Sequence, residues 1–200
     1  MVEKIHIDLY TEDMAQERFL EALIRRLLQE THRAAVIHHR SARGGHPRML
    51  QEFKAYQKAL EKNEFHRHRP GLLVLARDAN CHSHAKIHAE LKQSIDEGTF
   101  PVYVLACPDP YIERWYMADP ESFFQAVGAD CHIGKIKCKK DDYKKILVDA
   151  IKQSDNDAIY GGAEYALELV NVMDLYRAGK NERSLHLFIE EFHHALSRTS

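Results

Sequence analysis

Short apolar runs alternate with longer amphipathic stretches over the first two thirds of the chain, and this alternation predicts the fold. The runs with the alternating or continuous apolar pattern of strands are 4–10, 34–38, 71–76 and 100–106. The stretches with the apolar spacing of amphipathic helices are 12–30, about 49–62, a segment through Ile87, Leu91 and Ile95, and one or two short helices in 109–124. We expect Thr11 to cap the N-terminus of the first helix.

Strands that alternate with helices are typical of right-handed βαβ units, so we expect an α/β fold with a mostly parallel, Rossmann-like sheet and helices on both faces. The remainder of the chain has only helical patterns, at 141–154, 163–176 and 184–196. No repeat, low-complexity tract or linker interrupts the sequence. We therefore expect one domain over residues 1–200, in which the helices of 139–200 pack on an α/β core of 1–138.

Composition narrows the class of protein. Hydrophobic residues make up 44% of the chain and charged residues 29%, which is typical of a globular protein. No stretch of about 18 apolar residues occurs, and the N-terminus lacks the order of a signal peptide, so we expect a cytoplasmic protein without a membrane segment. The four cysteines are too sparse for a disulfide scaffold, and we expect them to be free thiols.

The net charge of −2 conceals a basic segment between His32 and Pro70. It holds nine Lys or Arg residues against three acids, a local net charge of +6. Such a segment is typical of a nucleic-acid surface, although acids nearby in the fold could balance it as an ordinary solvated face. The residues that we expect to bind nucleic acid are Arg40, Arg43, Arg48, Arg67 and Arg69.

Acidic side chains follow three of the predicted strands. They are Asp8 and Glu12 at the first strand, Asp78 with Asn80 after the third, and Asp109, Glu113 and Asp119 after the fourth. Chemistry in a parallel sheet collects at the carboxyl ends of the strands. A set of oxygen ligands there favours Mg²⁺ or Mn²⁺ and suits a phosphodiester substrate. The alternative interpretation is that these acids cap helix N-termini.

Three segments also resemble a known family. The stretch IDLYTE (7–12) is similar to the first Toprim motif, LVLARDAN (73–80) to its Asp-x-Asp motif, and IERWYMAD (112–119) to a Glu-x-Trp-x-x-x-Asp signature. That signature belongs to an uncharacterised Toprim-like family related to the overcoming-lysogenisation-defect (OLD) nucleases. Cys81, Lys86, Tyr160-Gly-Gly and 184–188 extend the resemblance over nearly the whole chain.

The resemblance implies a Toprim-like nuclease or nuclease subunit that acts on phosphodiester bonds with Mg²⁺ or Mn²⁺. It implies a metal site of Asp8, Glu12, Asp78, Asn80 and Glu113, with catalytic roles for Glu12, Asp78 and Glu113, and with Asp119 and Lys86 as further candidates. A setting in bacterial phage defence and a separately encoded ATPase partner follow from the same likeness. Asp8 stands where the motif has Glu, and Asn80 where it has Asp, which would weaken the metal site. The alternative is therefore a non-catalytic Toprim-like module that binds nucleic acid or a partner ATPase.

Other chemistries have weaker patterns. Cys81, His82, His84 and His88 could ligate zinc, as could Cys131 and His132 near Cys138, but no paired zinc-binding spacing accompanies them. Cys81 at a helix start could be a nucleophile, although nothing identifies its base. Trp115 and Tyr116 could stack on a base, or they could belong to the core.

Overall fold

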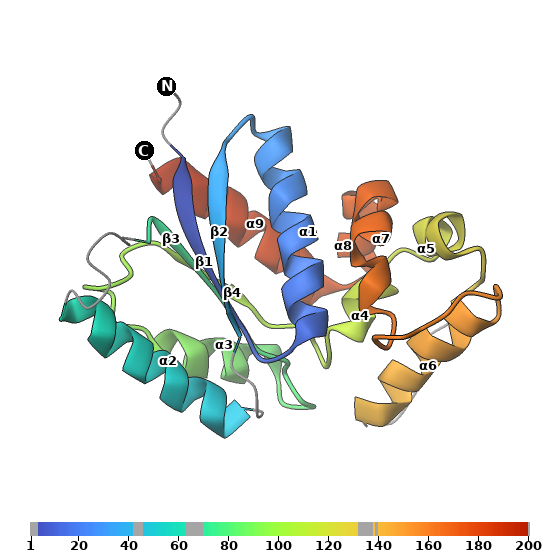
Figure 1. Ribbon diagram of the computed structural model, residues 1–200, viewed down its shortest axis with the longest axis horizontal. Helices are drawn as coiled ribbons and strands as arrows, with labels where there is room; N and C mark the ends of the chain where they lie inside the picture. Colours follow the sequence, from blue (N-terminus) through green and yellow to red (C-terminus); the bar gives the residue numbers. More distant parts are fainter. Residues whose placement is uncertain (1–3, 42–45, 63–69, 132–137, 139, 200) are drawn as a thin grey trace.

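A parallel sheet forms the centre of the molecule. The computed structural model describes residues 4–41, 46–62, 70–131, 138 and 140–199 (Figure 1). Within these ranges the sheet has four strands in the order β2-β1-β3-β4. The strands are β1 (Ile5–Thr11), β2 (Ala35–Ser41), β3 (Leu72–Ala76) and β4 (Tyr103–Ala106). All three strand pairs are parallel, as the alternation of strands and helices predicted.

Strand order places β1 next to β3 at the middle of the sheet. The chain leaves β1 for β2 on one side and leaves β3 for β4 on the other, so the direction of winding changes between the two central strands. Every residue of β3 is buried, which agrees with its continuous apolar sequence. Crevices for ligands form at such a switch point, outside the carboxyl ends of the strands.

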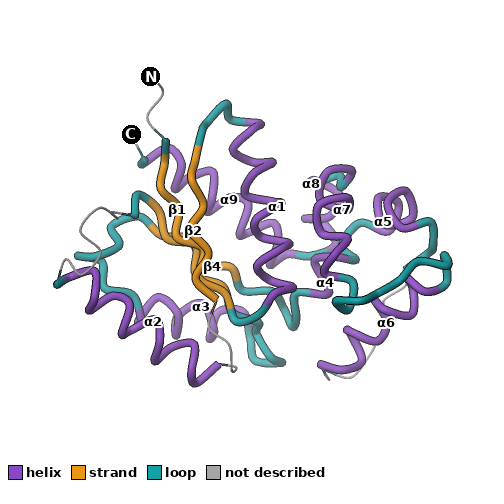
Figure 2. The backbone as a smooth tube through the Cα atoms, viewed as in Figure 1, coloured by secondary structure: helices purple, strands orange, loops and turns teal. Residues whose placement is uncertain are grey.

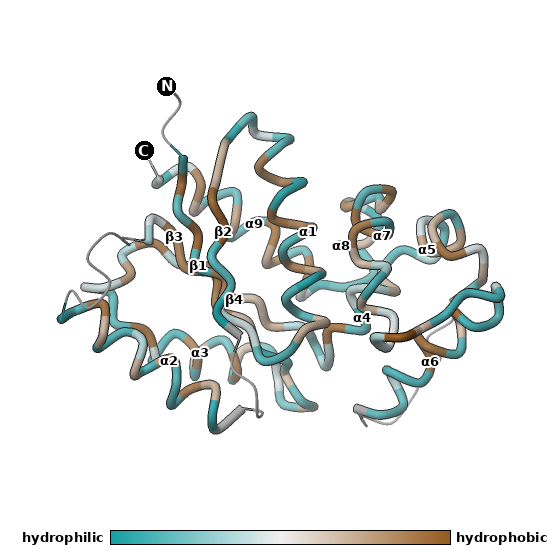
Figure 3. The backbone as a smooth tube through the Cα atoms, in the orientation of Figure 1, coloured by the Kyte–Doolittle hydropathy of each residue, from teal (hydrophilic) through white to brown (hydrophobic). Residues whose placement is uncertain are grey.

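Helices cover both faces of the sheet (Figures 1 and 2). On one face, α1 (Met14–Glu30) and α9 (Arg183–Arg198) share a buried apolar cluster with β1, β3 and β4. On the other face, α2 (His46–Glu61) and α3 (His84–Ser94) enclose a second cluster that includes Leu73, Leu75 and Leu105. Figure 3 shows the hydrophobic residues of the strands between these helix layers. The expected fold class is confirmed.

Further helices extend the first apolar cluster beyond the sheet, beside α1 (Figure 2). They are α4 (Glu113–Tyr116), α5 (Pro120–Val127), α6 (Lys140–Lys152), the 3-10 helix η1 (Ala163–Tyr165), α7 (Ala166–Val172) and α8 (Leu175–Asn181). The single helix expected at 163–176 is therefore broken. The break occurs because Met173 is extended and Asp174 caps α8 by accepting the Arg177 N–H. In the described ranges, no helix is both long and apolar enough to cross a bilayer.

The start of α1 differs from the sequence-based expectation. Thr11 is the last residue of β1 and is fully buried, so it does not cap the helix. Asp13 is the N-cap, and its Oδ1 accepts the Gln16 N–H at 3.0 Å. An acid followed three residues later by Gln is the sequence pattern of a capping box. This pattern places the N-cap of α1 at Asp13 and not at Thr11.

Candidate functional site

Carboxylates gather at the carboxyl edge of the two central strands. Tyr10 of β1 and Leu75 of β3 are register partners, and Asp13 and Asp78 each lie three residues beyond them. Parallel neighbours end at the same edge of a sheet, so the loops after β1 and β3 lie side by side. The switch point between these strands is thus lined by acidic residues.

Asp78 is the centre of this group. It is 1% exposed, and its Oδ1 accepts hydrogen bonds from Gln16 Nε2 at 2.9 Å and from the Ile112 N–H at 3.1 Å. The Asp78 N–H in turn donates to Glu12 Oε2 at 3.2 Å. Gln16 also accepts the Glu12 N–H at 3.0 Å. The side chain of Asp78 is therefore fixed by groups from separate segments of the chain.

The electrostatic environment of Asp78 disfavours its negative charge. Burial raises the pKa of its carboxyl well above the usual 3.8, and the charges of Asp13, Glu113 and Glu12 raise it further. The hydrogen bond from Gln16 opposes this shift without cancelling it. A carboxylate in such a position needs either a proton or a cation beside it.

Glu113 begins α4 and is 6% exposed. The residue before it, Ile112, supplies the backbone N–H that reaches Asp78. Burial raises the pKa of Tyr116 well above 10, and the charges of Asp13 and Glu113 raise it further, which places both acids in one electrostatic neighbourhood. Among the predicted site residues, Glu12 and Asp78 are therefore joined by a hydrogen bond, and Glu113 lies within electrostatic range of Asp78.

We name the set of Glu12, Asp13, Asp78 and Glu113 the acid cluster. Sequence reasoning missed Asp13, although the acid adjacent to Glu12 and the capping pattern with Gln16 were visible signals. All four side chains are carboxylates, the donor chemistry that Mg²⁺ and Mn²⁺ prefer, so the donor set fits these ions. As they stand, no three Asp, Glu, His or Cys side chains of the described segments are arranged to hold one metal ion.

The structure does not place Asp8 in the acid cluster. Asp8 pairs in register with Leu73, five residues before Asp78, which corresponds to roughly 16 Å along a strand. Its buried Oδ2 accepts a 2.5 Å hydrogen bond from the Tyr56 hydroxyl of α2, on the other face of the sheet. Burial raises the pKa of Tyr56, and the hydrogen bond to Asp8 adds to this, so Tyr56 remains a donor. Asp8 thus connects the sheet to α2.

Asn80 and Lys86 lie in the segment after Asp78. Asn80 has a φ of 49°, and its Nδ2 donates to the backbone oxygen of Asp78 at 3.2 Å. The Asn80 N–H donates to Pro110 O at 3.0 Å. Lys86 lies on α3 with its Nζ 3.9 Å from Glu90 Oε1 and its side chain 55% exposed. The amide of Asn80 therefore stabilises the turn, and Lys86 faces solvent beside an acid.

Asp119 occupies the N-cap position of α5 but does not cap it through its side chain. Its buried carboxylate accepts hydrogen bonds from Arg177 Nε at 2.6 Å, from the Asp174 N–H at 3.0 Å and from the Ser122 hydroxyl. Burial alone would raise the pKa of Asp119, but these hydrogen bonds together lower it. Asp119 therefore joins α5 to α8.

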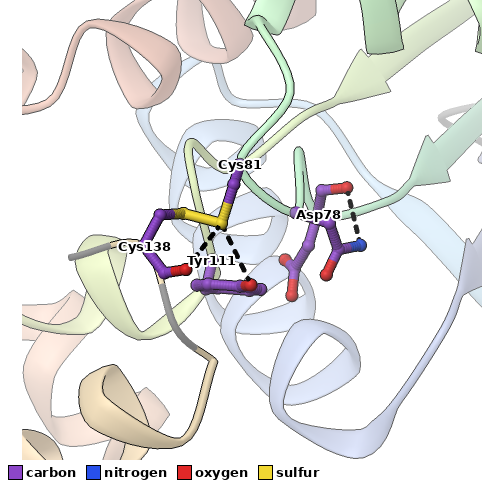
Figure 4. The surroundings of a disulfide bond; sticks show 5 residues. Asp78, Cys81, Tyr111 and Cys138 are labelled. Atoms are coloured by element: carbon purple, nitrogen blue, oxygen red, sulfur yellow. Dashed lines mark hydrogen bonds between the residues drawn. A yellow bond between two sulfur atoms is a disulfide. The ribbon is translucent and has the colours of Figure 1, made fainter.

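Two cysteines correct the expectation of four free thiols. Cys81 and Cys138 form a disulfide with a Cα–Cα distance of 5.7 Å (Figure 4). Cys107 and Cys131 are free and buried, and burial raises the pKa of each to about 12. The idea that Cys81 is a nucleophile is wrong for this state, because a disulfide sulfur has no thiolate. A sequence separation of 57 residues gave no local signal for the pairing.

His84 and His88, two of the candidate zinc ligands, lie on α3. The rings of His84 and His88 are 5.8 Å apart, and His88 Nε2 lies 3.0 Å from Glu191 Oε1 of α9. Burial lowers the pKa of His84, and the neighbouring His88 lowers it further. His132, part of the other zinc hypothesis, falls outside the described residues.

Only part of the predicted nucleic-acid surface can be placed. Arg48 is exposed on α2 and pairs with Glu52 at 2.7 Å, and the Arg40 guanidinium lies 4.9 Å from the ring centroid of Tyr56. Arg43, Arg67 and Arg69 fall outside the described residues. Trp115 and Tyr116 are fully buried in the apolar cluster, so the core interpretation is right and base stacking is excluded in this conformation.

The arrangement is that of a buried acid held rigidly among like charges, at the position where α/β proteins bind ligands. Its oxygen donors could hold a hard divalent cation, and a cation would relieve the repulsion between the carboxylates. Comparison of the chain with models of protein families, with curated proteins and with solved structures finds no match in any of the three.

Proposed function

We propose that this chain is a Mg²⁺- or Mn²⁺-dependent phosphodiester hydrolase, either a nuclease or the nuclease subunit of a larger assembly. The observation that carries the proposal is the carboxylate of Asp78, which is 1% exposed and surrounded by the charges of Asp13, Glu113 and Glu12. Burying such a group without a compensating cation costs free energy. Proteins maintain arrangements of this kind chiefly where a ligand or a reaction uses them.

The residues of the acid cluster have distinct parts in this proposal. Gln16 and the Ile112 N–H hold Oδ1 of Asp78, and among the described residues no hydrogen bond reaches its Oδ2. Oδ2 is therefore the atom of Asp78 that would bind the cation. Glu12 and Glu113 would supply further oxygens, and Asp13 would add charge while it caps α1. When bound, Mg²⁺ or Mn²⁺ supplies Lewis acidity toward phosphate oxygens and favours ionised water.

The substrate class rests on charge and on the Toprim resemblance. The basic segment between residues 32 and 70 would attract a polyanion, and Arg48 presents an exposed guanidinium there. A bound divalent cation contacts phosphate oxygens, and a basic surface attracts the rest of the polyanion, so the two features together favour a phosphodiester substrate. The ATPase partner, the defence setting and a cytoplasmic location remain parts of this proposal that come from the family likeness and the composition.

A cleavage assay tests the proposal. Purified protein would be incubated with single- and double-stranded DNA and with RNA, in Mg²⁺, in Mn²⁺ or in EDTA. We expect cleavage only with a divalent cation, and a loss of at least about a hundredfold in Glu113→Gln, since one ligand charge is removed. The matched control is Asp119→Asn, a buried acid outside the acid cluster, which should retain activity at temperatures where it is folded. Equal cleavage by both variants would reject the assignment of the site.

Two observations favour the second candidate, a non-catalytic module of the same fold. Asp8 accepts a hydrogen bond from Tyr56, and the side-chain amide of Asn80 donates to the backbone of the turn. Two of the five motif positions therefore stabilise the fold. Such a module would bind nucleic acid equally well in Mg²⁺ and in EDTA, and would cleave in neither. The same incubation, analysed by a gel-shift experiment, separates the two candidates.

A further inference from the structure

We propose that the Cys81–Cys138 disulfide is a redox-sensitive clamp that keeps the backbone around Asp78 ordered, and that a dithiol reductant opens it. Cys81 lies three residues after Asp78, and Cys138 lies two residues before α6. The bond therefore joins the loop that carries the central acid to the segment just before α6, far along the chain. Both cysteines are exposed residues, so the bond lies at the surface, where a small thiol can approach it.

The loop that the disulfide holds has a backbone that needs support. Asn80 and Cys81 have φ values of 49° and 66°, two consecutive residues other than glycine in the left-handed region. Each such residue is less stable there than in its preferred conformation, so the surrounding structure must hold it. The supports include the hydrogen bonds from the Ala79 and Asn80 N–H groups to Pro108 O and Pro110 O, the bond from the Asn80 side chain to Asp78 O, and the disulfide itself.

A chain of contacts leads from the disulfide to the carboxylate of Asp78. The Tyr111 hydroxyl lies 3.4 Å from Cys81 Sγ, and Figure 4 shows the Tyr111 ring beside the disulfide. The same ring packs on Tyr143 of α6, with centroids 5.5 Å apart. The next residue, Ile112, donates its N–H to Asp78 Oδ1 at 3.1 Å. Reduction would release the segment before α6 from Cys81, which would loosen one side of Tyr111 and, with it, the Ile112 amide, one of the two groups that hold Asp78 Oδ1.

The reaction is a thiol–disulfide exchange. One thiolate of the dithiol attacks a sulfur of the pair, forms a mixed disulfide and releases the other cysteine as a thiolate, which takes up a proton. The second thiol of the reagent then displaces the remaining cysteine. The reagent becomes a cyclic disulfide, and Cys81 and Cys138 gain two electrons and two protons as free thiols. Cys107 and Cys131 take no part, because burial raises the pKa of each to about 12.

Alkylation of the native protein tests the pairing. Oxidised protein should incorporate no iodoacetamide under native conditions, because its free cysteines are buried. After treatment with dithiothreitol it should incorporate two equivalents, located by mass spectrometry at Cys81 and Cys138. Two equivalents incorporated before reduction would show that the disulfide is absent and would overturn the proposal.

Hydrogen exchange tests the clamp. We expect the Ile112 and Asn80 amides to exchange at least about tenfold faster after reduction, while the Val74 amide in the centre of β3 keeps its protection. Wild type reduced by dithiothreitol is the primary sample, and Cys81→Ser/Cys138→Ser should behave like it even when never reduced. The matched control, Cys131→Ala, removes a buried free cysteine and should keep the redox response. Unchanged exchange at Ile112 after reduction would refute the clamp.

The consequence for cation binding rests on the proposed function, whereas the clamp itself does not. If the acid cluster binds Mn²⁺, reduction should weaken its affinity about tenfold, because the ligands must first be ordered. Calorimetry with Mn²⁺ alone on oxidised and reduced protein measures this. Faster exchange at Ile112 with no Mn²⁺ binding in either state would reject the metal site and leave the clamp standing. Equal affinity in both states would contradict the coupling.

Discussion

The side-chain amide of Gln16 donates to Asp78 Oδ1 at 2.9 Å, and this hydrogen bond joins residues 62 positions apart. It connects the first turn of α1, the helix that follows β1, to the loop after β3, and β1 and β3 are the strands that flank the switch point of the sheet. Because Gln16 also accepts the Glu12 N–H, its amide group is held at both ends. The central carboxyl of the acid cluster is thereby positioned before any ligand arrives.

The stability of the cation-free protein should depend on pH through Asp78. Its pKa is raised above 3.8 in the folded state, so the folded protein holds this proton more tightly than the unfolded chain does. The stabilisation is complete below about pH 4 and is lost as the pH rises toward the folded pKa. Asp78→Asn keeps an oxygen acceptor and lacks the charge. In EDTA, the melting temperature of Asp78→Asn minus that of wild type should therefore increase as the pH rises from about 4 to 8. Parallel pH profiles would show that Asp78 carries no shifted pKa.

Asp119 should behave in the opposite way. Its pKa is lowered, so its stabilising contribution is present above 3.8 and is lost as the pH falls through the folded pKa. Asp119→Asn removes the charge that Arg177 and Asp174 bind, and should cost about 1–3 kcal/mol at neutral pH. Urea unfolding at pH 7 and at about pH 3, below the ordinary pKa of the carboxyl, measures this, and the difference between variant and wild type should shrink at the lower pH. A neutral effect at pH 7 would contradict a structural role for this carboxylate.

The fold was predictable because its strands carry their signal locally. Leu72–Ala76 is apolar throughout and is buried throughout, so its place in the centre of a parallel sheet follows from five residues. The helix expected at 163–176 was not predicted correctly, because the break depends on Asp174 accepting a backbone N–H, an effect that apolar periodicity does not contain. Helix propensity and apolar periodicity indicate that a segment is helical, whereas the capping residue determines where the helix begins or ends.

The acid cluster was predictable only where an acid follows a strand. Glu12, Asp78 and Glu113 come together because the loops after parallel strands converge. Asp8 precedes the end of β1 by three residues, so alternation along the strand turns it toward Tyr56 instead. The disulfide was not predictable, because its pairing exists only once loops 57 residues apart meet.

Tyr56→Phe tests whether Asp8 serves the fold or the site. The variant removes the hydroxyl that donates to a fully buried carboxylate, which should cost about 1–3 kcal/mol of stability, or roughly 2–12 °C in melting temperature. If Asp8 stands apart from the acid cluster, Mn²⁺ should stabilise Tyr56→Phe as much as wild type. A selective loss of the Mn²⁺ effect would place Asp8 among the ligands after all.

Charge reversal tests the proposed nucleic-acid surface with a matched pair of variants. Arg48 and Arg25 are both exposed and both form i,i+4 pairs with Glu, but Arg48 lies on α2 in the basic segment and Arg25 on α1. Arg48→Glu should weaken binding to duplex DNA and reduce the slope of log affinity against log salt by about 0.9 for each phosphate that the protein no longer neutralises. Arg25→Glu should leave both quantities unchanged. The surface assignment fails if the two variants bind alike across a salt titration.

We propose that Asp78 binds a divalent cation within the acid cluster. The most direct test is to measure the melting temperatures of wild type and Asp78→Asn in EDTA and in millimolar Mn²⁺. Binding to the folded state alone adds stability of about 2.7 kcal/mol when the cation is at a hundred times its dissociation constant, so wild type should melt several degrees higher in Mn²⁺. Asp78→Asn should melt above wild type in EDTA at pH 7 and should gain little from Mn²⁺, because it lacks both the repulsion and the ligand charge. A Mn²⁺-induced shift of the same size in both proteins, or no shift in either, would contradict the site.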